Sequence, residues 1–433
     1  MSAATATVIT EVRARRVYDS RGRPTVEADV LLHGGAIGRA IAPAGASRGS
    51  REAVDLRDGG AAHGGLGVER ALANVRMTLA AAIRGLDACD QAAVDAALIA
   101  ADGTPDKSRA GGNAIVALSL AVAQAAASAQ RLALWRYLSA GAPVTLPLPE
   151  IQIFGGGAHA GRRLDVQDVM VMPVGATSFS DALTMVAEIY RAAGQWMSER
   201  GRIAGVADEG GWWPNFDSNE EALQALVAAI ERAGYVPGRD AAISLDIAAS
   251  ELAHAGRYRF RLDRRELDRD ALAALWLDWL DRYPIASIED PFAEDDDAGW
   301  QAFARAAGER VQIVGDDYLT TRADRVAAAA RDATCNAVLL KPNQAGTLTE
   351  TRAALDAART ARFATIVSAR SGETEDVTVA HLAVGWNAGQ LKVGSFARGE
   401  RMAKWNEGLR IEEALGAQAR FAGAAALVGY KPR

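Results

Sequence analysis

Three acidic side chains stand at the ends of apolar segments in the second half of the chain. They are Asp246 in AISLD, Glu289 in IASIE and Asp316 in IVGD. If these segments are parallel strands, their carboxyl ends share one rim, where three bare carboxylates would repel one another. A hard cation removes that repulsion, and ligation by oxygen alone suits Mg²⁺. The competing interpretation is that each acid only caps the helix after its strand.

Two lysines also lie toward the ends of predicted strands, Lys341 after AVLL and Lys392 within GQLKVGS. Lysine is rare in this chain: of 48 basic residues, only Lys107, Lys341, Lys392, Lys404 and Lys431 are lysines. Arginine stays protonated, whereas a lysine beside a metal ion can lose its proton and act as a base. The acids and lysines together predict metal-assisted removal of a weakly acidic proton. A lone lysine at a strand end more often forms a surface salt bridge.

Further acid–base candidates lie in two glycine-rich stretches. Glu209 in ADEGG is a candidate general acid, because the glycines beside it allow close approach of the backbone. The stretch GGGAHAGRRLDVQD supplies His159, Gln167 and Asp168. A lone histidine is more often structural, but this one has no apolar face to pack on.

Residues 363–378, FATIVSARSGETEDVT, predict a buried strand that delivers polar groups to the mouth of a pocket. A guanidinium fork and a hydroxyl are natural donors to a phosphate or a carboxylate, which suits Arg370 and Ser371. The small, inert Ala369 beside them requires an explanation.

The elements that must position these residues alternate along the chain. Residues 10–57 combine the strand-like TVEADVLL with a loop rich in small residues, and residues 66–140 predict alanine- and leucine-rich helices. The proline-rich APVTLPLPE, residues 142–150, predicts a linker and a domain boundary near residue 145. Strands alternating with helices follow, which indicates a parallel βα barrel with its site at the carboxyl ends of the strands. The predicted strands cover 169–174, 242–248, 285–290, 311–317, 337–343, 364–370 and 389–395.

Composition excludes several function classes. The net charge is −6 and the pI about 5.6, so no basic field invites nucleic acid. No charged head precedes an apolar core at the N-terminus, and the most apolar runs, such as NAIVALSLAVAQAAASA, are shorter than a membrane span. We therefore expect no membrane partner. Two cysteines, Cys89 and Cys335, fit a reducing cytoplasm.

Over almost its whole length the sequence resembles the enolase family. The motifs that carry the resemblance are YDSRGRPTVEADV, PAGAS-x-G, GGAHAG, ADEGGWWPN, LDIAASE, SIEDPF, VGDD, LLKPNQAGT, RSGETED and ERMAKWNEGLRIEEALG. The resemblance implies an α/β protein with an N-terminal α+β capping domain, residues 1–145, and a modified (β/α)₈ TIM-type barrel, residues 146–433. It also implies two Mg²⁺ ions, a homodimer or larger homo-oligomer, and a small phosphorylated or phosphonylated hydroxy acid as substrate.

The resemblance assigns roles to the barrel residues that match the family motifs. It makes Lys341 the base that takes the proton next to the substrate carboxylate, and it places Lys392 opposite, in contact with that carboxylate. The high-affinity Mg²⁺ ligands are implied to be Asp246, Glu289 and Asp316.

Other roles carried over concern the leaving group and the phosphate. Glu209 looks like the group that protonates the departing hydroxyl, with His159 beside it. Arg370 and Ser371 look like the phosphate clamp, and Ser47 in AGASRG matches the serine that closes over the second metal ion. Gln167 is expected at the substrate.

Three positions depart from the family pattern. Asp168 stands where the family has a glutamate that partners the acid, Ala369 stands where it has a histidine, and Arg48 stands where its closing loop has threonine. Because a carboxylate one methylene shorter moves its contact by about an ångström, Asp168 should disturb ordinary catalysis. Metal ligands and base are kept while residues near the phosphate and the acid are changed, which favours kept chemistry on an altered substrate.

The alanine opens space beside the phosphate, and the arginine adds positive charge on the loop that closes over it. A phosphonoformyl ester of glycerate, with a carboxylate on phosphorus, would need both changes. Its dehydration gives carboxyphosphonoenolpyruvate, a step toward phosphinate natural products. The alternatives are an ordinary enolase acting on 2-phosphoglycerate and a non-catalytic, enolase-like binding protein.

Overall fold

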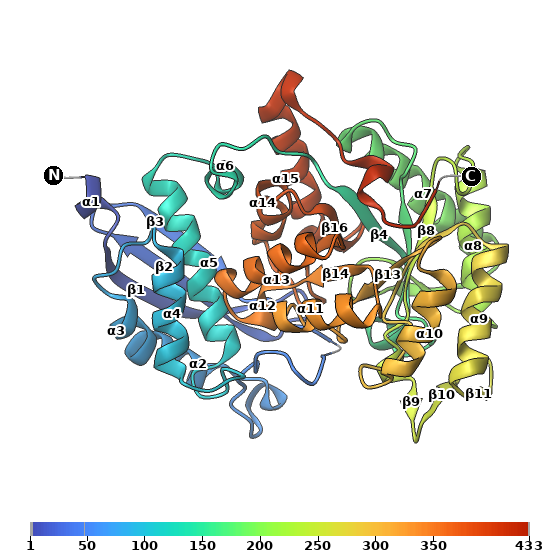
Figure 1. The fold of residues 1–433 in the computed structure, drawn as a ribbon, viewed down its shortest axis with the longest axis horizontal. Helices are drawn as coiled ribbons and strands as arrows, with labels where there is room; N and C mark the ends of the chain where they lie inside the picture. Colours follow the sequence, from blue (N-terminus) through green and yellow to red (C-terminus); the bar gives the residue numbers. More distant parts are fainter. Residues whose placement is uncertain (1–2, 47, 432–433) are drawn as a thin grey trace.

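The computed structural model describes residues 3–46 and 48–431. The chain forms two parts, an N-terminal α+β part and a larger barrel that lie side by side (Figure 1). The N-terminal part is built on an antiparallel sheet in the order β1 (Ile9–Tyr18), β2 (Pro24–Leu32), β3 (Ile37–Ile41). Its helices are α1 (Ala3–Ala6), α2 (Glu69–Asn74), α3 (Ala80–Ile83), α4 (Gln91–Asp102), α5 (Gly112–Ala129) and α6 (Leu134–Ser139), with a π-helical turn at Val75–Leu79.

Helix α5 forms the centre of this part. It packs against β2 and β3, and nearly all of its Ala, Val, Ile and Leu side chains are buried. Of the helices in residues 3–46 and 48–431, α5 alone is long and apolar enough to cross a membrane, and 83% of it is buried inside the protein. The expectation that this apolar run is shorter than a membrane span is therefore wrong by length, although the helix is buried in the protein.

The second part is a closed barrel of eight strands, β4, β5, β8 and β12 to β16, in which β16 pairs with β4 to complete the ring. The strands are β4 (Leu148–Gly155), β5 (Asp168–Met172), β8 (Ala242–Asp246), β12 (Ile285–Glu289), β13 (Gln312–Gly315), β14 (Ala337–Leu340), β15 (Ala364–Ser368) and β16 (Gly389–Ser395). All seven predicted strands are present, most of them a few residues shorter than expected.

The expectation of an all-parallel barrel is wrong at one strand. β5 runs antiparallel to both of its neighbours, β4 and β8. A short connection of Gly156 to Gln167, with a single 3₁₀ turn at Gly157–Ala160, leads from β4 to β5. It contains no crossover helix, and a parallel pair would need one.

The predicted linker is partly wrong as well. β4 begins at Leu148, inside the proline-rich stretch, and pairs with β16 along Leu148 to Gln152. The prolines lie before the strand and at its second residue, where a missing N–H is tolerated. The apolar residues that follow are buried, so the stretch forms a barrel wall.

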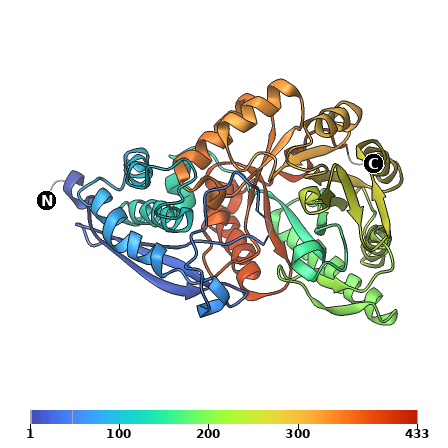
Figure 2. The same ribbon diagram turned by 90° about the horizontal axis from the view of Figure 1, so that it is seen from below.

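Helices surround the barrel strands (Figures 1 and 2). They are α7 (Phe179–Glu199), α8 (Asn219–Arg232), α9 (Arg269–Arg282), α10 (Asp297–Ala307), α11 (Ala323–Asp332), α12 (Pro342–Ala345), α13 (Leu348–Thr360), α14 (Thr378–Gly385) and α15 (Gly399–Leu415). Smaller strands are β6 (Ile203–Val206), β7 (Trp212–Pro214), β9 (Ala253–His254), β10 (Arg257–Phe260) and β11 (Arg265–Leu267). The remaining 3₁₀ turns are Ala62–Gly65, Ala249–Glu251, Gly416–Gln418 and Gly423–Ala426.

The segment after β3 leaves the N-terminal sheet and reaches the barrel (Figure 2). Ala44 forms a β-bridge with Gly372, just after β15, and the backbone N–H of Ser50 donates to Glu294. The N-terminal part therefore supplies one wall of the barrel mouth. Ser47 lies outside the described residues.

Candidate active site

The barrel brings the three strand-end acids together. Asp246 and Glu289 are the last residues of β8 and β12 and stand in register, and Asp316 follows β13 directly. All three side chains are buried. None of them caps a following helix, because the N-cap positions of α9, α10 and α11 are Asp268, Asp296 and Arg322.

Both strand-end lysines point at these acids. Lys341 follows β14, and its Nζ lies 2.5 Å from Asp316. Lys392 lies within β16, and its Nζ lies 2.7 Å from Glu289 and 3.0 Å from Asp246. These are buried ion pairs at the barrel mouth, which contradicts the surface salt bridge as an interpretation of either lysine.

The carboxylates suit a divalent cation. Two ammonium groups do not balance three carboxylates, and Oε1 of Glu289 is buried with no hydrogen-bond partner. Burial and then the nearby Asp246 raise the pKa of Glu289 well above its usual value. A carboxylate that keeps its proton and has one unpartnered oxygen, in the company of other acids, is suited to bind Mg²⁺ in place of that proton. Asp316 also groups with Asp290 and Asp317, whose ligand oxygens all lie within 4.8 Å of one another.

The base candidate is protonated in this arrangement. Burial lowers the pKa of Lys341, but the nearby carboxylates, Asp316 first and then Glu289, together raise the pKa overall. Lys341 can therefore lose its proton near neutral pH only when another cation takes over the charge of Asp316. The same acids that hold the metal would thus control the protonation of the lysine.

A second group of side chains faces the acids from β5 and the loops beside it. Nδ1 of His159 lies 3.0 Å from Oδ1 of Asp168, and Nε2 lies 2.9 Å from Oγ of Ser371 and 3.6 Å from Oε1 of Glu209. The three ionisable groups are buried. Asp168 also accepts a hydrogen bond from the amide of Gln152. The shortened Asp168 thus reaches Glu209 through the imidazole.

The proton of this group resides on the histidine. Burial opposes the charged imidazole, but Asp168 and then Glu209 outweigh it and raise the pKa of His159 to about 9. Burial also opposes ionisation of Glu209, yet His159, Arg401 and Lys392 lower its pKa to about 2. Glu209 is therefore ionised, and a proton donated from this corner of the site would come from the His159–Glu209 pair.

This arrangement predicts a pH-dependent stability. A pKa raised from about 6.5 in the unfolded chain to about 9 stabilises the fold fully below pH 6.5, and the contribution disappears as the pH rises through 9. We expect the free energy of unfolding to fall over this window by roughly 3 kcal/mol at most. Denaturant unfolding from pH 6 to pH 10 measures it. The His159→Gln variant serves as control, and a constant difference between the two proteins would contradict the prediction.

Arg370, Ser371 and Ala369 line the same cavity as these groups. The cavity also takes in Gln167, whose Nε2 donates to Asp246 at 3.1 Å and whose Oε1 is buried without a partner. Its volume is about 20 Å³, room for about one water molecule. Substrate entry therefore requires some of the groups that line the cavity to move.

Arg48 lies away from this cavity. Its guanidinium donates to Asp55 at 3.0 Å, and Asp55 also accepts from Arg57 at 2.8 Å. The Arg48 side chain is 45% exposed. Contact between Arg48 and a substrate therefore requires the segment that follows Ala46 to move.

Three further residues of the site were not identified from the sequence. Glu52 forms a buried ion pair with Arg370, Gln344 donates to Asp316, and Arg401 donates to the backbone oxygens of Arg370 and Ser371. Gln344 and Arg401 lie inside motifs that had been noted, LLKPNQAGT and ERMAKWNEGL. Glu52 had no such signal.

Comparison with known proteins identifies the family to which this chain belongs. The family model described as the enolase C-terminal TIM barrel domain matches residues 143–429, and the enolase N-terminal domain model matches residues 9–138. The chain belongs to the enolase family. Enolase 1 of Desulfitobacterium hafniense (strain Y51) is 48% identical over 416 residues, which are 95% of each chain. This membership makes the chain a hydro-lyase of a family that uses Mg²⁺ and acts on small phosphorylated acids.

Proposed function

We propose that this enolase dehydrates a glycerate whose phosphorus carries an additional carboxylate, a phosphonoformyl ester, to give carboxyphosphonoenolpyruvate. The place of the reaction would be phosphinate or phosphonate natural-product biosynthesis. The observation that supports this substrate is Ala369, a small side chain that lies next to Arg370 in the wall of the cavity.

The described side chains divide the elimination between two faces of the cavity. Nζ of Lys341 removes the proton on the carbon next to the substrate carboxylate, and the electron pair moves toward that carboxylate. The electron pair then returns to form the carbon–carbon double bond as the bond to the hydroxyl on the neighbouring carbon breaks. That hydroxyl leaves as water with a proton from the His159–Glu209 pair. Mg²⁺ held by Asp246, Glu289 and Asp316 would stabilise the charge that develops on the carboxylate. One water is lost and nothing is oxidised.

The other carboxylate of the substrate, on phosphorus, requires a second cation. Arg370 is already paired with Glu52 at 3.0 Å, so it offers less net charge than an isolated arginine. Arg48 lies on the loop that the resemblance expects to close, and among the described residues its half-exposed side chain pairs with Asp55. Because such pairs contribute about 0–1 kcal/mol, Arg48 can exchange Asp55 for a substrate carboxylate at little cost.

Two alternatives give different outcomes. An ordinary enolase would convert 2-phosphoglycerate, and neither Ala369 nor Asp168 supports that activity. A non-catalytic binding protein would have no need for buried, metal-type acids facing two lysines. Turnover of the purified protein with Mg²⁺ on 2-phosphoglycerate and on the phosphonoformyl ester separates all three. Ordinary rates on 2-phosphoglycerate with none on the ester would refute the proposal.

A single substitution tests the role of Arg48. We expect Arg48→Thr to weaken use of the phosphonoformyl ester about 10- to 150-fold, the value of one charge-assisted hydrogen bond of roughly 1.5–3 kcal/mol. Simple phosphate esters should be affected far less. The ratio of kcat/KM for the two substrates measures this preference.

Arg51→Thr is the matched control, because it removes the same charge from the same segment. Arg51 lies 3.6 Å from Glu294 and does not line the active-site cavity. If both variants lost the substrate preference equally, the effect of Arg48 would come from the positive charge of the segment and not from a specific contact with the substrate.

Two further properties are inferred from the composition and from the family. We infer a cytoplasmic location from the sparse cysteines, and a homodimer or larger assembly with two Mg²⁺ ions per subunit from the family. Light scattering and fractionation test them.

A further inference from the structure

Glu52 joins the N-terminal part to the anion-binding arginine. Its carboxylate accepts hydrogen bonds from Nη1 and Nη2 of Arg370 at 3.0 and 3.2 Å, and from the backbone N–H of Gly49 at 3.1 Å. Both side chains of the pair are buried. Because both oxygens of one carboxylate meet two nitrogens of the guanidinium, the pair fixes the orientation of the Arg370 fork.

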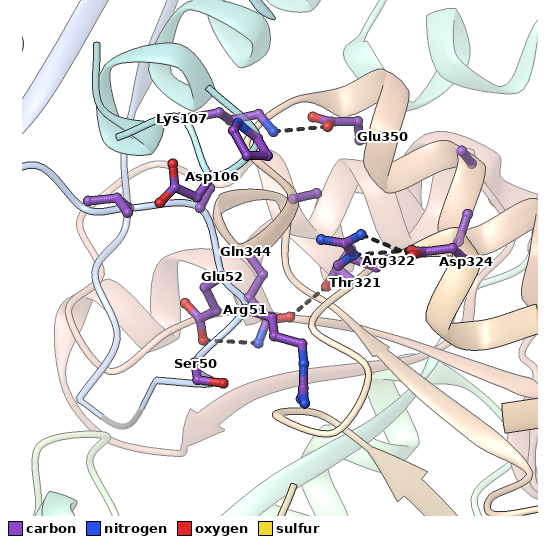
Figure 3. Close-up of a pocket in the computed structure, with 16 residues that line it drawn as sticks. Ser50, Arg51, Glu52, Asp106, Lys107, Thr321, Arg322, Asp324, Gln344 and Glu350 are labelled. Carbon is purple, nitrogen blue, oxygen red and sulfur yellow. Dashed lines mark hydrogen bonds and ion pairs between the residues drawn. The ribbon is translucent and has the colours of Figure 1, made fainter. Parts of the chain in front are cut away.

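Gln344 connects this pair to the acids. Its Nε2 donates to Asp316 at 2.8 Å and to Glu52 at 3.3 Å, and its Oε1 accepts from Thr321 at 2.6 Å. The side chain is 2% exposed, and Figure 3 shows it between Glu52 and Thr321. The buried amide of Gln344 therefore contacts both Glu52, the partner of Arg370, and Asp316, a candidate metal ligand.

The chain brings this amide to its place through the base itself. Gln344 is the third residue of the short helix α12, which begins at Pro342 directly after Lys341. Asn343 on the same turn accepts from Nη1 of Arg370 at 3.1 Å. A shift of Arg370 or Glu52 would thus be transmitted to the turn that carries Lys341.

We propose that Glu52 and Gln344 are positioning residues that hold the Arg370 fork and Asp316 in one fixed arrangement. The inference rests on the anion-binding role of Arg370 in the proposed function. Neither residue touches the reacting atoms. Their effect is on how well Arg370 meets an anion and how well Asp316 is placed for a metal ion.

The competing explanation is that these contacts only fasten the two parts of the chain together. A comparison is available in the cavity of about 580 Å³ on the outer side of Glu52. There Lys107 and Glu350 form another ion pair between the two parts, at 2.9 Å, drawn in the same view (Figure 3). This pair makes no contact with Arg370 or Asp316, so it fastens without positioning.

The test uses variants that keep the charge. Glu52→Asp shortens the carboxylate by one methylene, so it cannot meet Arg370 and Gln344 together. Gln344→Met keeps the size of the side chain and removes the amide. Glu350→Asp is the matched control. Binding of phosphonoformate and of inorganic phosphate in Mg²⁺ is measured by titration calorimetry, with thermal unfolding of each protein alongside.

We expect Glu52→Asp and Gln344→Met each to weaken phosphonoformate binding roughly 10-fold or more. Gln344→Met should also weaken Mg²⁺ binding measured without anion, while Glu52→Asp leaves it nearly unchanged. The double variant should lose less than the product of the two single losses, because both act on one arrangement. Glu350→Asp should bind both ligands like the wild type, whatever its melting temperature.

Unchanged anion affinity in a folded Glu52→Asp protein would overturn the inference, and so would an equal loss in Glu350→Asp. If Glu52→Asp does not fold, Gln344→Met decides, because it leaves the Arg370–Glu52 pair whole. If the wild type binds inorganic phosphate as tightly as phosphonoformate, the specificity proposal fails, and the variants still test positioning with phosphate. A wild type that binds neither anion would overturn both.

Discussion

Replacement of Lys341 by arginine should lower turnover by about 10⁴-fold, although the positive charge and the ion pair with Asp316 can be kept. The reason is that arginine does not lose its proton at any pH at which the protein is folded. Lys341→Ala should be equally inactive. Lys392 also lines the cavity, but it is paired with Glu289 and Asp246, so it cannot take the place of Lys341 as the base.

The measurement is a single-turnover assay with Mg²⁺ present, together with exchange of the substrate's α-proton with solvent deuterium. Lys107→Arg is the matched control. It makes the same substitution in another buried, ion-paired lysine, and it should leave turnover close to wild type. Substantial proton exchange in Lys341→Arg would remove Lys341 as the base.

Much of this site could be predicted because its residues lie at strand ends. Asp246 and Glu289 are the last residues of β8 and β12, and Asp316 comes one residue after the end of β13. A parallel arrangement then brings these positions to one rim, whatever the details of packing. The scarcity of lysine singled out Lys341 and Lys392, and a glycine-rich stretch singled out His159; all of these groups meet at the barrel mouth.

Strand direction and long-range pairing were not available from local patterns. The side-chain alternation of β5 is the same in either direction, so its antiparallel course depends on the short connection from β4. The proline-rich start of β4 was mistaken for a linker because its burial is provided by β16, more than 200 residues later. Glu52 lies in a polar loop and is recognisable only once Arg370 is opposite it.

Protonation states also required the structure. The sequence predicts that Lys341 can lose its proton beside a metal ion and that Glu209 can donate one. In the described arrangement the pKa of Lys341 is raised and that of Glu209 is lowered, because each is buried beside groups of opposite charge. The sequence identified the participants, whereas their charges depend on distances of a few ångströms.

Removal of divalent cations should abolish turnover, and Glu289→Gln should make the loss permanent at ordinary Mg²⁺ concentrations. Glu289 carries a buried oxygen without a partner and a pKa raised well above its usual value, so Mg²⁺ must displace a proton when it binds there. We therefore expect Mg²⁺ affinity to fall as the pH decreases and one proton to be released per site on binding. Titration calorimetry in buffers of different ionisation enthalpy measures both.

In Glu289→Gln the proton release should disappear, and the Mg²⁺ affinity should fall by about 100-fold or more, since a ligating carboxylate contributes at least as much as its outer-shell partners. Lys392 would keep its pair with Asp246, so the barrel mouth retains a balanced ion pair and the variant can fold. Asp95→Asn is the control, because Asp95 on α4 is equally buried and its hydrogen bonds, to Thr349, Gln91 and Ser119, involve no residue of the active site. Unchanged affinity and proton release in Glu289→Gln would place the metal elsewhere, with the group of Asp290, Asp316 and Asp317 as the remaining acidic cluster at this rim.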